Sequence, residues 1–142
     1  MRARITERFR VEEVPGQPRQ GRTCVRLLDA LEYRVGDAES DELIVVPVGF
    51  VTDFASVPWG LWNLFPPLGP WGRPAIVHDY LYDTGGLWGR YTRKQADGIF
   101  REAMEVVGVP AWRRALMYRA VRLGGASGWK RGNKPPIRQL VG

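Results

Sequence analysis

The first half of the chain alternates apolar and polar positions, which is the pattern of half-buried β-strands. Residues 5–14 form a weak strand candidate because charged residues interrupt the alternation. Residues 23–35 form a stronger candidate, either a strand or a hairpin, because apolar, aromatic and β-branched residues recur at alternate positions. Residues 43–46 are a short apolar run typical of a buried strand, and Pro47 ends it.

The second half of the chain has the spacing of helices. Pro74 suits the first turn of a helix that extends to Tyr82. Thr92 is a good N-cap for a helix over residues 93–107, and a third helix is expected over residues 111–123. In the second helix, apolar residues recur three and four positions apart and predict its buried face: Ala96, Ile99, Phe100, Ala103, Met104 and Val107.

Together these patterns predict an α+β fold with a small antiparallel sheet in the N-terminal half and about three helices in the C-terminal half. A chain of 142 residues has the size of one domain. We expect that domain to cover residues 1–123, and residues 124–142 to form a basic tail rich in Gly and Pro. No apolar run approaches the ~20 residues that cross a bilayer, and no secretion signal is visible. The single Cys24 fits a chain folded in a reducing cytoplasm.

Charge is distributed unevenly along the chain. The net charge is +6, and no Asp or Glu follows Glu105. The basic residues of that C-terminal stretch are Arg113, Arg114, Arg119, Arg122, Lys130, Arg131, Lys134 and Arg138. This excess favours an anionic partner, which can be nucleic acid, phospholipid headgroups or an acidic protein surface. The alternative is a solvated helix face followed by a flexible tail.

The segment His78-Asp79-Tyr80-Leu81-Tyr82 carries the strongest chemical signal. His78 is the only histidine, and histidine moves protons near neutral pH. Tyr82 lies four residues later, on the same helix face. Asp97 lies at the edge of the apolar stripe of the next helix, where a carboxylate needs a partner. We therefore predict that Asp97 or another carboxylate lies within hydrogen-bonding reach of His78. His78, Asp97 and Tyr82 form either a catalytic site or a structural network between two helices.

Two further carboxylates are candidate metal ligands. Asp79 points about 100° around the helix from His78, and Asp53 lies in the segment G-F-V-T-D-F-A-S-V-P. Carboxylates and backbone carbonyls bind hard cations such as calcium. One His and one Cys are too few for the usual zinc ligand sets. The alternative role for Asp53, with Thr52 and Ser56, is to satisfy backbone groups in a turn.

Three motifs together resemble a family of small uncharacterised proteins encoded by bacteriophages and prophages. The motifs are V-P-x-G-F-x-T-D-F-A-S-V-P at residues 46–58, H-D-Y-L-Y at residues 78–82, and R-K-x-A-D-x-x-F-x-x-A-M at residues 93–104. The resemblance implies a viral or prophage origin and supplies no established activity.

A more distant resemblance concerns the His-Asp pair alone. H-D-x-x-Y on one helix with D-x-x-F on the next is similar to the secreted calcium-dependent phospholipases of the A-two type. The resemblance implies that His78 is the base, that Asp79 binds calcium, and that Asp97 and Tyr82 support His78. With only Cys24, this chain lacks the disulfides of those enzymes.

Two functions from different classes follow from these signals. The first is a phage- or prophage-encoded hydrolase-like protein that uses the His-Asp site, with the host envelope as its target. The second is a non-catalytic virion component, such as a tail or assembly protein, that binds other virion proteins. A third hypothesis is a nucleic-acid-associated accessory protein, which rests on the basic C-terminal stretch alone. We expect the protein in the host cytoplasm during synthesis and, under the second reading, in the virion.

Overall fold

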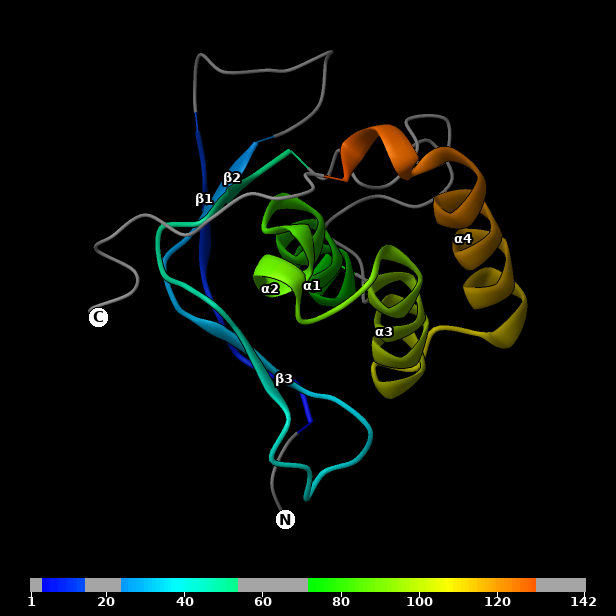
Figure 1. Cartoon of the computed structure of the whole chain (residues 1–142). Helices are drawn as coiled ribbons and strands as arrows, with labels where there is room; N and C mark the ends of the chain where they lie inside the picture. Colours follow the sequence, from blue (N-terminus) through cyan, green and yellow to red (C-terminus); the bar gives the residue numbers. More distant parts are fainter. Residues whose placement is uncertain (1–3, 15–23, 54–71, 130–142) are drawn as a thin grey trace.

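The computed structural model describes residues 4–14, 24–53 and 72–129 and has an α+β fold (Figure 1). The strands are β1 (Val11–Glu13), β2 (Val25–Leu27), β3 (Leu31–Arg34), β4 (Leu43–Val46) and β5 (Val51–Thr52). The helices are α1 (Gly72–Asp83), α2 (Gly85–Gly89), α3 (Arg93–Val106) and α4 (Ala111–Gly124), followed by the 3-10 turn η2 (Ala126–Gly128). The predicted fold class is confirmed, and the short α2 is an addition to the three expected helices. None of the helices in these ranges has the length and apolar character needed to cross a membrane.

All strand pairs are antiparallel. β1, β2 and β5 form one sheet in that order, and β3 pairs with β4 in a second sheet. An isolated bridge joins Ile5 to Tyr33 and continues the register in which Val11 faces Leu27. Residues 24–35 are thus not a hairpin, because β2 and β3 are separated by a bend at Leu28 and Asp29 and each pairs with other strands.

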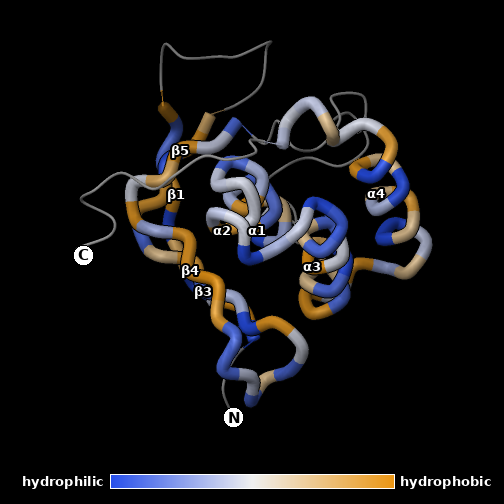
Figure 2. Tube along the Cα trace, in the orientation of Figure 1, coloured by the Kyte–Doolittle hydropathy of each residue, from blue (hydrophilic) through white to orange (hydrophobic). Residues whose placement is uncertain are grey.

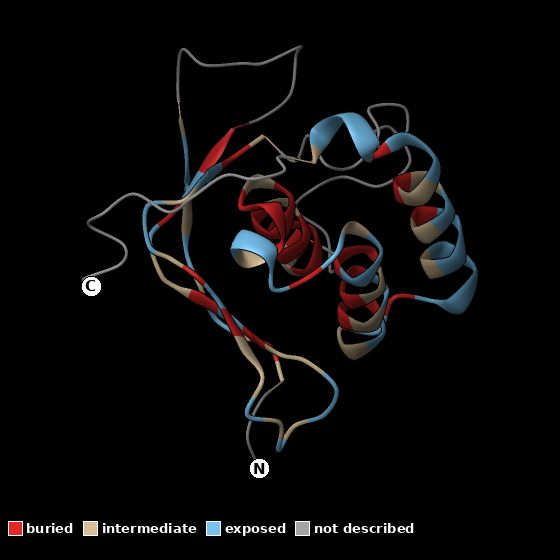
Figure 3. Cartoon of the chain, viewed as in Figure 1, coloured by how far each residue is buried: buried red, intermediate tan, exposed pale blue. Residues whose placement is uncertain are grey.

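One face of these strands is buried, as the alternation predicts. The buried residues come at every second position along β2, β3 and β4, and the residues between them are more exposed. Figure 3 shows buried positions alternating with more exposed ones along these strands. The buried side chains are Val25, Leu27, Leu31, Tyr33, Ile44 and Val46.

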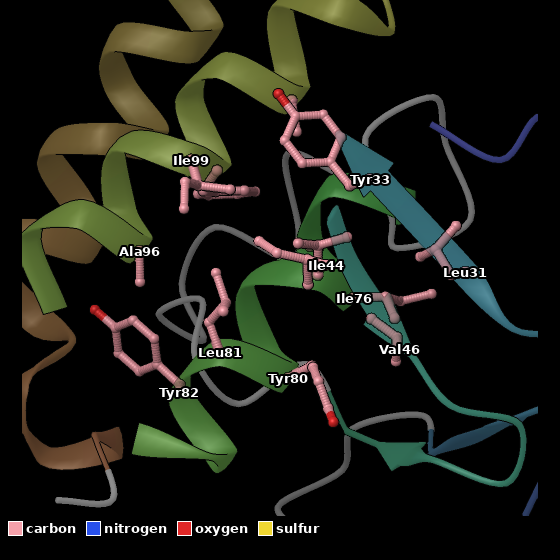
Figure 4. Close-up of a cluster of buried hydrophobic side chains, with 14 of the residues drawn as sticks. Leu31, Tyr33, Ile44, Val46, Ile76, Tyr80, Leu81, Tyr82, Ala96 and Ile99 are labelled. Carbon is pink, nitrogen blue, oxygen red and sulfur yellow. The ribbon is translucent and has the colours of Figure 1, made fainter. Parts of the chain in front are cut away.

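Helix α1 is the centre of the molecule. It lies between the strands and α3, and α4 packs on the other side of α3 (Figure 1). Side chains from β3, β4, α1 and α3 meet in one apolar cluster (Figure 4). Nearly the whole of α1 is buried, including His78, Tyr80, Leu81 and Tyr82. Polar groups on α1 must therefore find their hydrogen-bond partners inside the protein.

Helix α3 begins as predicted. The Thr92 side chain accepts a hydrogen bond from the Gln95 backbone N–H, and the Gln95 side chain accepts one from the Thr92 backbone N–H. This reciprocal pair is a capping box, which satisfies two donors at the helix N-terminus. The predicted stripe is buried from Ala96 to Met104, and Val107 is partly buried. The helix ends at Val106, close to the predicted end near Val107.

A left-handed turn in α2 was not predicted. Gly86, Leu87 and Trp88 have φ values of 73°, 55° and 56°, a region that residues with a side chain seldom adopt. Gly86 is required here because a Cβ atom would lie 2.0 Å from the Tyr91 carbonyl oxygen. The sequence indicated only that the preceding helix ends near this point.

The chain beyond α4 remains in contact with α1 as far as Trp129. The Trp129 ring packs edge-on against Tyr82, with 5.1 Å between ring centroids, and Gly125 lies close to the same tyrosine. The predicted boundary between residues 1–123 and the tail at 124–142 stays a prediction, since residues 130–142 lie outside the described ranges.

The Thr92 cap offers a clean test of the local structure. Because Thr92 is exposed, Thr92→Ala removes the hydrogen bond to Gln95 without leaving a cavity. We expect the free energy of unfolding to fall by about 0.5–2 kcal/mol. Thr92→Ser, which keeps the oxygen, is the matched control and should stay near wild type in urea denaturation. Equal stability of the Ala and Ser variants would contradict the capping role.

Candidate functional site

Asp97 is the centre of a buried polar cluster. Its Oδ1 atom lies 2.7 Å from His78 Nε2 and accepts a hydrogen bond from the Tyr82 hydroxyl at 2.7 Å. Its Oδ2 atom accepts a hydrogen bond from Arg122 Nη1 at 2.7 Å and lies 3.6 Å from Arg93 Nη1. The predicted contact between His78 and Asp97 is confirmed, and the predicted grouping with Tyr82 is confirmed with it. We call these five residues the Asp97 cluster.

Three helices build the cluster. His78 and Tyr82 lie one turn apart on α1 and present both side chains to α3, from which Asp97 projects. Arg122 comes from the last turn of α4. The His78 ring packs between the rings of Tyr82 and Phe100, with centroid distances of 4.3 Å and 4.5 Å. As a result, the side chains of both His78 and Asp97 are 0% exposed.

The surroundings hold Asp97 in its charged form. Burial alone raises the pKa of a carboxyl group, but the hydrogen bonds from His78, Tyr82 and Arg122 outweigh burial and lower the pKa of Asp97. Burial, together with the hydrogen bond to Asp97, raises the pKa of Tyr82. At neutral pH, Tyr82 therefore stays protonated and donates to an ionised Asp97.

Sequence reasoning missed both arginines of the cluster. Arg93 also donates hydrogen bonds to the backbone carbonyls of Val121 and Arg122, at 3.1 Å and 3.3 Å. It thereby joins the first turn of α3 to the last turn of α4. Its spacing of four residues from Asp97 is a signal that could have identified it. Arg122 has no such local signal, because its contact with Asp97 depends on how α4 packs.

The geometry defines what the cluster can do chemically. A general base must reach the proton that it removes, directly or through one water molecule. The complete burial of His78 leaves no exposed surface for that contact. In the described arrangement the cluster joins α1, α3 and α4, and the catalytic roles of His78, Asp97 and Tyr82 stay predictions.

The two candidate metal ligands lie apart from the Asp97 cluster. Asp79 faces β5, where one of its carboxylate oxygens accepts a hydrogen bond from the Thr52 hydroxyl. Asp53 follows Thr52 directly, and both aspartates are half-buried. Within the described ranges, no group of three or more His, Cys, Asp or Glu side chains is arranged to hold a metal ion. Calcium takes 6–8 oxygen ligands, which include backbone carbonyls as well as carboxylates. The ligand roles of Asp79 and Asp53 stay predictions.

A second polar cluster escaped sequence reasoning entirely. Glu102 of α3 accepts hydrogen bonds from Arg4 and from the Tyr33 hydroxyl, both at 2.5 Å, and from the Gly36 backbone N–H at 2.8 Å. Burial and the bond to Glu102 raise the pKa of Tyr33. These contacts attach the N-terminal strands to the helical half.

The lowered pKa of Asp97 makes stability depend on acid pH. An unfolded Asp has a pKa of ~3.9, so the unfolded chain takes up the proton first as the pH falls. The contribution of Asp97 is fully present above that value and is lost as the pH falls through the lower, folded pKa. We expect Asp97→Asn to cost about 3–5 kcal/mol near pH 7, with the difference from wild type shrinking below about pH 4.

Urea denaturation of both proteins across this pH range measures the effect. Asp29→Asn is the matched control, since Asp29 also has a lowered pKa but pairs with Arg10 on the surface. We expect this control to change stability little. A constant difference between wild type and Asp97→Asn at every pH would contradict the charged state assigned to Asp97.

Comparisons with known proteins find an uncharacterised family and an uncharacterised relative. The family model "Protein of unknown function (DUF1353)" matches residues 25–121. The uncharacterised protein y4jT of Sinorhizobium fredii (strain NBRC 101917 / NGR234) is 32% identical over 78 residues, which cover 54% of this chain and 22% of that protein. This chain thus matches about a fifth of the length of that relative, and no solved structure matches. Since the family match covers more than half of the chain, the protein belongs to the DUF1353 family.

Proposed function

We propose that this protein is a non-catalytic component of a phage or prophage particle, with a role in the tail or its assembly. The observation that carries the proposal is the complete burial of His78 and Asp97. The side chains with the strongest catalytic signal are used inside the core, where they join helices. Synthesis in the host cytoplasm and incorporation into the virion, through contacts with other virion proteins, are parts of this proposal.

Residues of the motifs that carry the phage resemblance contact one another inside the fold. Thr52, from the first motif, donates its hydroxyl hydrogen bond to Asp79 of the second motif. Phe50 and Tyr80, from the same two motifs, pack edge to face with 5.2 Å between ring centroids. These contacts give the polar and aromatic residues of the two motifs a structural role that requires no catalysis. It supports a module whose motifs specify a fold.

The third motif contributes to the same core. Asp97 binds His78 of the second motif, and Phe100 packs against the His78 ring. Arg93, the first residue of the motif, joins α3 to α4. A buried carboxylate left without its partners is strongly destabilising. These residues therefore specify how the three helices pack.

A hydrolase acting on the host envelope is the second candidate. The observation that favours it is the pair of contacts from His78 and Tyr82 to one oxygen of Asp97, which are the supporting contacts implied by the phospholipase resemblance. Since Asp97 engages Nε2, the other ring nitrogen, Nδ1, is the base that this mechanism requires. The mechanism also requires a rearrangement that exposes the His78 ring.

His78→Gln separates the two candidates. Gln keeps a hydrogen-bond donor for Asp97 but removes the titratable ring. If the cluster is structural, we expect the free energy of unfolding to fall by about 1–3 kcal/mol. A catalytic base would instead show a loss of activity of about 10²–10⁴-fold with little change in stability. Urea denaturation and a panel of phospholipid and peptidoglycan hydrolysis assays, with and without calcium, measure both effects.

The control for this experiment is Tyr91→Phe, which removes a 2.6 Å hydrogen bond to the carboxylate of Glu42 outside the Asp97 cluster. Mass spectrometry of purified virions tests the particle assignment directly. Hydrolysis by the wild type that His78→Gln abolishes, with stability intact, would overturn the non-catalytic proposal. Absence of the protein from the particles and from their assembly intermediates would overturn the virion assignment.

A further inference from the structure

Helix α4 presents an unusual outward face. Only Met117 and Val121 of this helix are buried. Trp112, Leu116 and Leu123 have exposed fractions of 63%, 40% and 88%. Their spacing of four and seven residues places all three side chains in one stripe along the helix, on the side away from the buried pair. Large apolar side chains gathered in this way indicate a contact surface.

The position of α4 leaves this stripe accessible. It is the outermost of the described helices, on the far side of α3 from the strands (Figure 1). Figure 3 shows the outward side of α4 as exposed, and Figure 2 shows hydrophobic segments along the same helix. An exposed helix of this kind can lie lengthwise along a planar surface.

The arginines of α4 differ in exposure: Arg113 and Arg119 are exposed, and Arg114 and Arg122 are partly buried. Arg114 and Arg122 bind groups within the protein, the Val109 carbonyl oxygen and the Asp97 carboxylate. Arg119 is exposed and lies within the apolar stripe, between Leu116 and Leu123. Arg113 is exposed, and its guanidinium lies 5.2 Å from the centre of the Trp112 ring. The outward face is therefore both apolar and positively charged.

We propose that the outward face of α4 binds the surface of an anionic lipid bilayer. Trp favours the headgroup level of a bilayer, and leucines insert just below it. Arg119 fits such a surface because its long side chain can extend among apolar groups and still reach a lipid phosphate. If the partner were a protein groove, Arg119 would instead need a carboxylate of that partner at one fixed position. The proposal does not depend on whether the protein is a virion component or a hydrolase.

Charge complementarity argues for this occupant over a second copy of the chain. The whole stretch after Glu105 lacks acidic residues. Two α4 faces packed together would bring Arg113 and Arg119 of each copy near those of the other, and like charges in contact are unfavourable. Anionic headgroups instead supply a continuous negative surface that attracts each exposed arginine.

Co-sedimentation of the full-length protein with lipid vesicles tests the proposal. One set of vesicles contains phosphatidylcholine with phosphatidylglycerol, and the other contains phosphatidylcholine alone. We expect binding to the anionic vesicles only, and weaker binding as salt rises. Trp112→Ser/Leu123→Ser and Arg113→Gln/Arg119→Gln should each weaken binding at least tenfold. Circular dichroism melts verify that the variants are folded, which is expected because the substituted side chains are exposed.

Matched controls remove similar groups elsewhere. Val48→Ser removes an exposed apolar side chain near the strands, and Arg8→Gln/Arg26→Gln removes two positive charges from the N-terminal half. Both should bind anionic vesicles like the wild type. Binding that survives both α4 variants but is lost in Lys130→Gln/Arg131→Gln/Lys134→Gln would assign the interaction to the tail and overturn the proposal. Absence of vesicle binding, or a dimer that the Trp112→Ser/Leu123→Ser variant dissociates, would also overturn it.

Discussion

The buried carboxylate of Asp97 is the constraint on which the helical half depends. A charged group with no exposed surface is costly unless hydrogen-bond donors surround it. Here the hydrogen-bond donors come from α1 and α4, and Arg93 of α3 adds an ion pair. Each hydrogen bond requires its donor atom within about 3 Å of the carboxylate, so α1 must present one particular face to α3, and α4 must end beside Arg93. We infer that this requirement selects one rotation of each helix, which apolar packing alone specifies less strictly.

The strands pack against α1, on the side of that helix opposite α3. Helix α1 is buried on nearly all sides, so it needs apolar neighbours on each side. On the side away from α3, β3 and β4 supply such neighbours, including Ile44 and Val46 (Figure 4). Glu102 then binds Tyr33 and Arg4. Helix α3 therefore carries two carboxylates with different tasks. Asp97 joins the helices to one another, and Glu102 joins them to the strands.

Local signals made a good part of this structure predictable. The Thr92 cap, the shared face of His78 and Tyr82, and the need of Asp97 for a partner depend on residues close in sequence, and the structure has all three. The contact between Arg4 and Glu102 joins residues 98 positions apart, and no local pattern marks it. The left-handed turn at Leu87 and Trp88 was also beyond prediction, because neither residue type favours that conformation.

Net charge and residue type were weaker guides to function than position. The C-terminal excess of arginine suggested an anionic partner, yet Arg114 and Arg122 act inside the protein. The neighbours and the exposure of an arginine distinguish one that can bind a partner from one that stabilises the fold. Arg122 is held by Asp97, whereas Arg119 lies exposed among Trp112, Leu116 and Leu123. The same reasoning applies to His78, whose residue type suggests proton transfer while its complete burial against Phe100 and Tyr82 favours a structural role.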